Sequence, residues 1–262
     1  MSTPLSLATL RTRLAALDAP PGGGVVRRVP LGLAAADRRL GGGLKVPALH
    51  EVHAATAVQA PAAAGFALGL ALRASDRTLV WITEGRGAHE AGGLYGPGLH
   101  EWGLAPQDLL LVRAPDAAAV LAAGEEALKS GAAGAVVMSV WGVARAFTLT
   151  ATRRLALAAA EGGAAALLVR AAAVPAPGAV ETRWSVRAAP SAELEARAPG
   201  RPAFAATLTR SRAGVPPEEW IMEWDRDTRV FVEPQASGGL VSLPAQRPAG
   251  ARDGPDRRSR AA

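Results

Sequence analysis

Short apolar segments that are typical of buried strands alternate with helix patterns along the chain, and this alternation limits the fold most. The strand-like segments are Ala48 to His53, Thr78 to Thr83, Leu109 to Arg113, Ala135 to Val140 and Ala164 to Arg170. The helix patterns that separate or follow them are Ala62 to Arg73, Pro97 to Trp102, Asp116 to Ser130 and Thr148 to Glu161. Apolar strands separated by helices are typical of a parallel sheet that is covered on both faces.

The pattern changes after Ala171, where strand-like segments follow one another without long helices. These segments are Arg183 to Arg187, Phe204 to Arg210, Glu219 to Trp224 and Arg229 to Val232. Strands with no helix between them favour antiparallel pairing. The sequence therefore predicts an α/β fold, with a mostly parallel sheet, helices on both of its faces and an antiparallel C-terminal extension.

Composition divides the chain into three parts. We expect an N-terminal helix and linker over residues 1–24, a core domain over 25–233 and a disordered basic tail over 234–262. The helix pattern begins at Thr3-Pro4, and its leucines at spacings of three and four share one face: Leu7, Leu10, Leu14 and Leu17. That face either packs on its own domain or binds a neighbouring subunit.

The composition also limits the chemistry and the location of the protein. The chain of 262 residues has no cysteine, which excludes disulfides, thiolate metal sites and cysteine nucleophiles. A net charge of +6 suits nucleic-acid binding, although arginine richness is also what a GC-rich genome produces. We expect neither a signal peptide nor an apolar run long enough to span a membrane, and we expect a cytoplasmic protein.

The connection after the strand that ends at His53 is where an open parallel sheet would bind a phosphate. A phosphate-binding loop there would read G-x-x-x-x-G-K-[ST], with lysine on the phosphates and a hydroxyl on Mg²⁺. Residues 54–65 contain one glycine, a proline and no lysine, and the only lysines, Lys45 and Lys129, lie elsewhere. The sequence therefore predicts no nucleotide-binding residue, no catalytic residue and no cofactor.

Metal ligands are also missing from the expected places. Met138 and Ser139 occupy the end of a strand where a magnesium-dependent hydrolase needs an aspartate. Glu84, at the end of another strand, could orient a water molecule, but no phosphate or metal ligand accompanies it. His50 and His53 look like a metal pair, yet side chains three apart on a strand point to opposite faces. We expect no metal site.

Several segments between Val29 and Val232 resemble the RecA-like ATPase core. They are Leu33 to Leu44, Trp81 to Glu84, and Glu126 to Ala132 with the strand that follows. The more particular pattern is similar to the ImuA family, the inducible mutagenesis protein A of bacterial SOS mutagenesis cassettes. Its segments are Ala48 to His53, Gly93 to Leu99, Leu149 to Leu155, Thr207 to Gly214 and Glu219 to Trp224.

The resemblance implies a non-catalytic accessory protein of SOS-induced, error-prone translesion DNA synthesis. Such proteins act by protein contacts in a mutasome with ImuB (a Y-family polymerase relative), an error-prone DNA polymerase alpha subunit and RecA, and so reach the nucleoid through partners. Compared with RecA, the phosphate lysine and the magnesium aspartate are missing, and the loop at 171–180 is short. These departures argue against ATP use and against filament formation on DNA. Whether the protein forms a homo-oligomer stays open.

Two groups of residues are candidates for contacts with macromolecules. Trp220 and Trp224 share one strand face with Met222, which either packs in the core or, if exposed, binds a partner. Six arginines fall near the ends of late strands and could contact DNA phosphates, unless they are simply solvated: Arg145, Arg170, Arg183, Arg187, Arg210 and Arg212.

Three other functions remain as alternatives. A DNA-binding repair mediator that needs no ATP would bind single strands with a steep salt dependence. A divergent RecA-like ATPase would use an unusual phosphate loop. A division inhibitor of the SOS response would cause cell filamentation when overexpressed.

Overall fold

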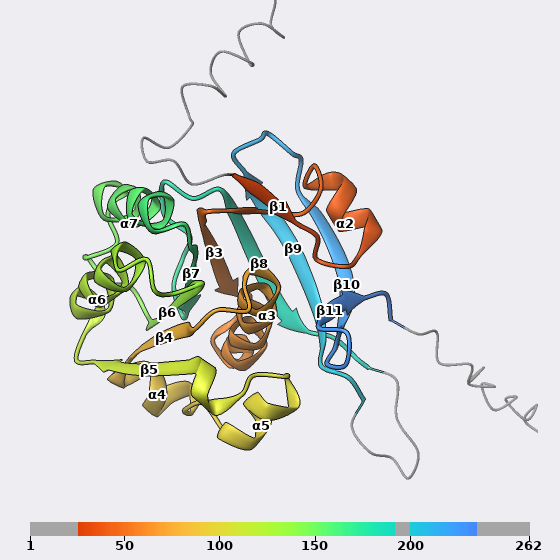
Figure 1. The fold of residues 1–262 in the computed structure, drawn as a ribbon, viewed down its shortest axis with the longest axis horizontal. Coiled ribbons are helices and arrows are strands. Elements are labelled where there is room, and N and C mark those ends of the chain that lie inside the picture. The colour runs from red at the N-terminus through yellow and green to blue at the C-terminus, as the bar shows by residue number, and fades with distance from the viewer. Residues whose placement is uncertain (1–25, 192–199, 235–262) are drawn as a thin grey trace, which may run out of the picture.

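The structure is a computed structural model that describes residues 26–191 and 200–234. Within these residues, nine strands form one sheet: β3 (Ala48–Ala54), β4 (Leu79–Glu84), β5 (Leu109–Ala114), β6 (Ala135–Trp141), β7 (Ala165–Ala171), β8 (Thr182–Ala188), β9 (Ala203–Ser211), β10 (Glu218–Asp225) and β11 (Val230–Val232). Their spatial order is β11-β10-β9-β8-β3-β7-β6-β4-β5 (Figure 1). The fold is thus a mixed α/β structure around a large central sheet.

The six strands from β5 to β8 in this order are all parallel. The remaining pairs, β8 with β9, β9 with β10 and β10 with β11, are antiparallel. The expected placement of residues 183–187 in the antiparallel extension is therefore wrong, because β8 lies parallel to β3. The connection 172–181 crosses β3, which lies between β7 and β8 in the sheet. After this crossover, β8 runs in the same direction as β3 and β7.

Helices cover both faces of the sheet (Figure 1). Their bounds are α2 (Ala34–Arg39), α3 (Ala60–Ala74), α4 (Gly85–Ala91), α5 (Gly96–Glu101), α6 (Ala117–Lys129) and α7 (Leu149–Gly162). One hydrophobic cluster joins α3 to one face of the sheet, and a second joins α6 and α7 to the opposite face. A small antiparallel sheet of β1 (Arg27–Val29) and β2 (Leu44–Val46) precedes the main sheet.

Helices α6 and α7 each begin at a residue whose side chain caps the first turn, and this cap fixes where the helix starts in the sequence. Asp116 accepts a hydrogen bond from the amide of Ala119 at 2.8 Å, and Thr148 accepts one from Ala151 at 3.1 Å. Gly163 ends α7 in the left-handed conformation, with φ of 71°. These local signals explain why the predicted bounds of α6 and α7 agree with the structure.

One stretch, Ala57–Ala74, is apolar and long enough to span a membrane by length and composition alone. No Asp, Glu, Lys or Arg lies between His53 and Arg73, so the expectation that no apolar run reaches this length is wrong. In the fold, this stretch consists of a single 3₁₀ turn followed by α3, and ten of the fifteen residues of α3 are buried. The stretch is the core helix of the domain.

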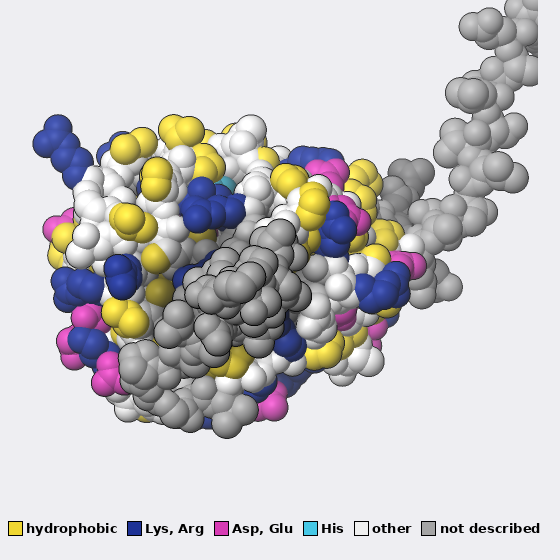
Figure 2. All heavy atoms as spheres, turned by 90° about the horizontal axis from the view of Figure 1, so that it is seen from above, with side chains coloured by type: hydrophobic (Ala, Val, Ile, Leu, Met, Phe, Trp, Pro, Cys, Tyr) yellow, Lys and Arg dark blue, Asp and Glu magenta, His cyan; other side chains and the backbone are white. Residues whose placement is uncertain are grey.

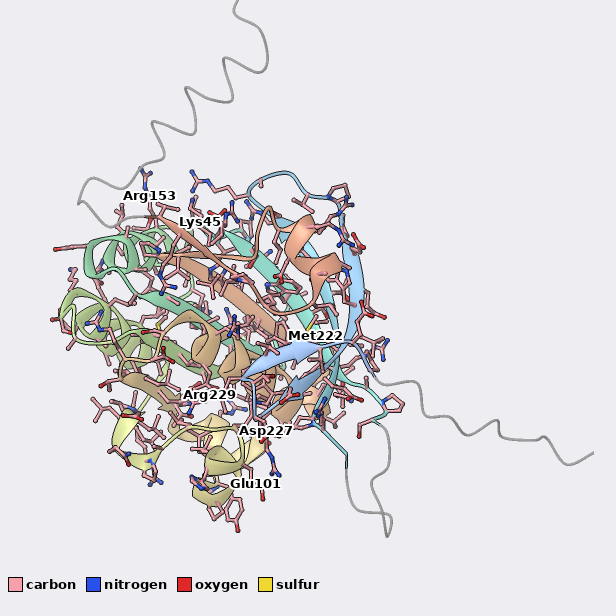
Figure 3. All side chains as sticks on the ribbon, turned by 45° about the vertical axis from the view of Figure 1, so that its right-hand side comes forward. Lys45, Glu101, Arg153, Met222, Asp227 and Arg229 are labelled. Carbon is pink, nitrogen blue, oxygen red and sulfur yellow. The ribbon has the colours of Figure 1, made fainter. Side chains whose placement is uncertain are left out.

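The C-terminal strands close the core on the α3 side. Met222 on β10 is fully buried, and Asp227 and Arg229 lie in the turn and strand start that follow β10 (labelled in Figure 3). The guanidinium of Arg229 lies close to Gly103, two residues beyond the end of α5. Arg229 also accepts a hydrogen bond at its carbonyl from Arg73 of α3, at 3.2 Å. These contacts hold the last strands of the sheet against α3 and α5.

Candidate functional site

The connection between β3 and α3 is the place where a phosphate-binding loop would lie. In the structure this connection is hydrogen-bonded to β8: the amide of Ala55 donates to the carbonyl of Val186 at 2.9 Å, and the side-chain Oε1 of Gln59 accepts from the amide of Ala188 at 2.7 Å. Both lysines form ion pairs elsewhere, Lys45 with Glu181 at 3.2 Å and Lys129 with Glu125 at 2.6 Å. No lysine is therefore placed to neutralise a triphosphate at this connection.

A cavity of about 290 Å³ lies beside this connection, between α3, α4, α5 and the ends of β4 and β6. Its walls are mainly apolar, and they include Trp81, Leu99 and Trp102. Thr83, Arg113 and Ser139 supply most of its side-chain polarity. This composition suits an apolar group better than a chain of phosphates with bound Mg²⁺.

Glu84 is the last residue of β4, at the edge of the sheet where an acid-base residue would be expected. Its Oε2 accepts a hydrogen bond from the amide of Trp141 at 3.2 Å, which joins the ends of β4 and β6. The carboxylate therefore has a structural bond within the sheet. Strand β6 contains no Asp or Glu, so its end presents no carboxylate that would complement Glu84.

A buried group of charged residues lies at the centre of the sheet, on the face that α7 covers. Glu51 and His53 of β3 share this face because they are two residues apart. Glu51 Oε2 accepts a hydrogen bond from Arg183 Nε of β8 at 2.5 Å, and Glu51 Oε1 lies 3.1 Å from His53 Nε2. The exposed fraction of each of these residues is 9% or less. We call Glu51, His53 and Arg183 the β3–β8 cluster.

The cluster keeps its carboxylate ionised although it is buried. Burial alone would raise the pKa of Glu51, but the hydrogen bonds and charges of His53 and Arg183 outweigh burial and lower this pKa. Sequence reasoning missed the cluster because it compared His53 with His50 rather than with Glu51. The available signal was the presence of three ionisable residues in a strand that is otherwise apolar, since buried charges need partners.

A second cavity, of about 670 Å³, opens next to the cluster. His53, Arg183 and Arg210 supply its ionisable side chains, and Ser185 and Thr209 supply hydroxyl groups. Part of its wall is the connection 172–181, which the arginines hold: Arg183 Nη2 donates to the carbonyl of Ala176 and Arg210 Nη1 to that of Gly178. The structure thus brings together two of the six arginines that the sequence marked for phosphate contacts.

The other four arginines are dispersed. Arg170 is buried and stacks over the ring of Phe147 at 4.0 Å, so it is not available to the backbone of a nucleic acid, and that prediction is wrong. Arg187 pairs with Glu219 at 3.0 Å, and Arg145 and Arg212 are exposed. On the visible part of the face in Figure 2, basic side chains lie in separate groups among apolar and acidic ones.

Trp220 and Trp224 face the interior, which rules out the exposed partner-binding patch considered from the sequence. Trp220 is 7% exposed and Trp224 1% exposed. Trp224 stacks on Trp102, the residue that follows α5, with ring centroids 5.3 Å apart, and the ring centroids of Trp220 and Trp184 are 6.0 Å apart. The residues pack in the core because this face of β10 covers α3 and α5.

His50 points away from His53 and belongs to a separate polar network, as the strand alternation predicts. Its Nε2 donates to the carbonyl of Lys45 at 2.9 Å, and its Nδ1 accepts from the hydroxyl of Thr182 at 2.8 Å. Burial lowers the pKa of His50 to about 4, although the bond to Lys45 and the charge of Glu181 oppose the shift. Within the described residues, no group of three or more His, Cys, Asp and Glu could hold a metal.

Acidification should destabilise the protein through His50, by about 3 kcal/mol between pH 6.5 and pH 4. The unfolded chain takes up a proton on this residue near pH 6.5 and the folded chain only near pH 4. Stability is therefore complete above pH 6.5 and falls as the pH falls. Denaturant unfolding at pH 6.5 and pH 4.5 should show about 2 kcal/mol of this loss, before the lowered pKa of Glu51 adds its own contribution.

The variant His50→Gln lacks this titration, so its free energy of unfolding should fall less between pH 6.5 and pH 4.5. His100→Gln is the matched control, because His100 is exposed and should leave the loss unchanged. An equal loss of stability in His50→Gln and in the unaltered protein would contradict the assignment.

Neither a protein-family model nor a curated protein matches this chain. The function must therefore be argued from the residues and from the geometry described above.

Proposed function

We propose that this chain is a non-catalytic accessory protein of SOS-induced, error-prone translesion DNA synthesis, built on a RecA-like core. It acts by protein contacts with an ImuB-type polymerase relative, an error-prone DNA polymerase alpha subunit and RecA. The observation that carries the proposal is the β3–α3 connection, which has the place of a phosphate-binding loop without its lysine and glycines. A core of this kind, without a triphosphate cradle, is suited to binding other macromolecules.

The topology supports the RecA-like interpretation. The first strand of the parallel sheet, β3, lies in its interior and leads by a short connection into the core helix α3, which is the strand–loop–helix order of a P-loop protein. The strand order also differs from both common doubly wound orders. Strands β9 to β11 then extend the sheet antiparallel beyond β8, in agreement with the proposed C-terminal extension.

The proposed partner contact rests on the leucine face of the N-terminal segment. Leu7, Leu10, Leu14 and Leu17 lie outside the described residues, as do residues 235–262 of the proposed tail. With Trp220 and Trp224 buried, this face is the remaining apolar surface that the sequence assigns to a partner. Action at the nucleoid would follow from the partners.

Deletion of the gene in its host should lower the frequency of damage-induced mutations, while ordinary recombination stays unchanged. The reason is that an accessory protein supports error-prone synthesis without taking part in strand exchange. Mutation frequency after ultraviolet irradiation and recombination frequency are the two measurements. Unchanged mutagenesis would contradict the proposal, and so would magnesium-dependent ATP hydrolysis by the purified protein.

Replacing both Leu10 and Leu14 by glutamate should weaken co-purification with the partners and leave the core folded. Two charges on the leucine face make burial of this face at an interface unfavourable. The matched control is Thr12→Glu with Ala16→Glu, which adds the same charge at helical positions away from this face. Equal co-purification of the two double variants would count against the leucine face as the contact.

A further inference from the structure

The second cavity has the composition of an anion site. Its ionisable side chains are His53, Arg183 and Arg210, and no Asp or Glu lines it within the part of the chain that the structure describes. Glu51 is not among the lining residues, and its two carboxylate oxygens lie 2.5 Å from Arg183 Nε and 3.1 Å from His53 Nε2. The charge of Arg183 is therefore balanced, and Arg210 adds a positive charge for which residues 26–191 and 200–234 supply no carboxylate in the cavity lining.

The cavity also holds a buried polar group that lacks a partner. His53 is 3% exposed and lines the cavity, and its Nδ1 has no hydrogen-bond partner among the described residues. A buried polar atom without a partner is uncommon in folded proteins and indicates a bound water molecule, an ion or a functional role. This observation is independent of the arginines, and it concerns a residue that lines the same cavity.

Further donors surround this position. Arg210 uses one of its N–H groups, for the carbonyl of Gly178 at 3.3 Å, which leaves other groups of the guanidinium for a ligand. Ser185 is the register neighbour of His53 on β8, and its side chain lines the same cavity. Guanidinium, imidazole and hydroxyl groups that converge on one space are the usual donors to a phosphate.

We propose that this cavity binds a phosphate group, held by Arg210 and His53 and supported by Arg183. The site is separate from the apolar cavity under α4 and α5. It is not a nucleotide-hydrolysis site, because it supplies no carboxylate for Mg²⁺. The phosphate is either a free ion or part of a single-stranded nucleic acid backbone. This inference does not depend on the proposed role in mutagenesis.

Inorganic phosphate should bind the full-length protein saturably, and Arg210→Gln should weaken this affinity about tenfold or more, because it removes a charged donor. Calorimetric titration at constant ionic strength measures the affinity. Arg187→Gln is the matched control, since Arg187 is an exposed arginine of β8 that pairs with Glu219 outside the cavity. His53→Gln tests the buried donor, and circular dichroism verifies that each variant is folded.

The outcomes separate the proposal from general salt effects. Phosphate stabilises most proteins by exclusion from their surface, so a rise in melting temperature that is equal in Arg210→Gln and the unaltered protein overturns the site. The absence of saturable binding overturns it as well. Selective loss of binding in Arg210→Gln and His53→Gln, with Arg187→Gln unaffected, supports it.

A single-stranded oligonucleotide identifies the source of the phosphate. If the nucleic acid backbone occupies the cavity, the oligonucleotide competes with inorganic phosphate, and Arg210→Gln reduces the slope of log affinity against log salt by about one. If the oligonucleotide does not compete while phosphate still binds, the occupant is the free ion or a small phosphorylated molecule. Both results support a phosphate site.

Discussion

Replacing Arg183 by methionine should lower the free energy of unfolding by about 3–5 kcal/mol, because it leaves Glu51 as a buried charge without its arginine partner. Glu51 is 4% exposed, and Arg183 Nε lies 2.5 Å from its Oε2. Glu51→Met should cost about as much, since it leaves the Arg183 guanidinium buried without a carboxylate. Urea unfolding at pH 7 measures both losses.

The double variant Glu51→Met with Arg183→Met distinguishes this explanation from a simple loss of packing. Removing both charges leaves no buried ion, and methionine side chains of similar length can fill the space. The double variant should therefore be more stable than either single variant. Arg187→Met is the control on the same strand: its pair with Glu219 is exposed, so the expected loss is below about 1 kcal/mol. Additive losses in the double variant would contradict coupling.

The main elements were predictable from the sequence because each one has a strong local signal. Strand β7 consists of buried residues throughout, and Arg170 is the one charged residue among them. Helix α6 starts at the Asp116 cap, and Gly131 follows its end with φ of 65°. Apolar runs, caps and glycine ends act over a few residues, so they can be recognised without knowing the tertiary structure.

The pairing of the strands was less predictable. The connection 172–181 contains no helix, which favoured an antiparallel neighbour for β8. The structure places β8 beside β3 rather than beside β7. The connection therefore crosses β3, and β8 runs parallel to β3. The segment before β3 was missed for a related reason. Strands β1 and β2 have three residues each, and α2 lacks a side-chain cap, so their stability comes from distant contacts.

In the candidate site too, the sequence predicted how neighbouring residues are arranged but not which distant residues they contact. Alternation along β3 correctly separates His50 from His53. The partner of Glu51, however, is 132 residues away in the sequence, and it lies beside Glu51 only because β8 pairs with β3 in the register that places Arg183 opposite Glu51. Whether Trp220 and Trp224 face the core also depended on what covers β10. The sequence could define which residues share a face, but not what lies against that face.

Replacing Phe66 by alanine should destabilise the protein by about 3–5 kcal/mol, because it opens a cavity where α3 meets the C-terminal strands. Phe66 is fully buried, and its ring centroid lies 5.4 Å from that of Trp184, 6.0 Å from that of Phe204 and 5.3 Å from that of Phe231. One side chain of α3 thus contacts β8, β9 and β11. Denaturant unfolding, followed by tryptophan fluorescence, measures the loss.

Tyr95→Ala is the control for Phe66→Ala, since Tyr95 is 72% exposed and its removal should change stability by no more than about 0.5 kcal/mol. The denaturant concentration at the unfolding midpoint should be lower in Phe66→Ala, while the slope of unfolding free energy against denaturant concentration stays the same. An unchanged slope would show that the variant exposes as much surface on unfolding as the unaltered protein. A loss below about 1 kcal/mol would mean that the antiparallel strands do not depend on α3. The last strands of the sheet would then have to be held by backbone pairing alone, which the burial of Trp224 and Phe231 against α3 argues against.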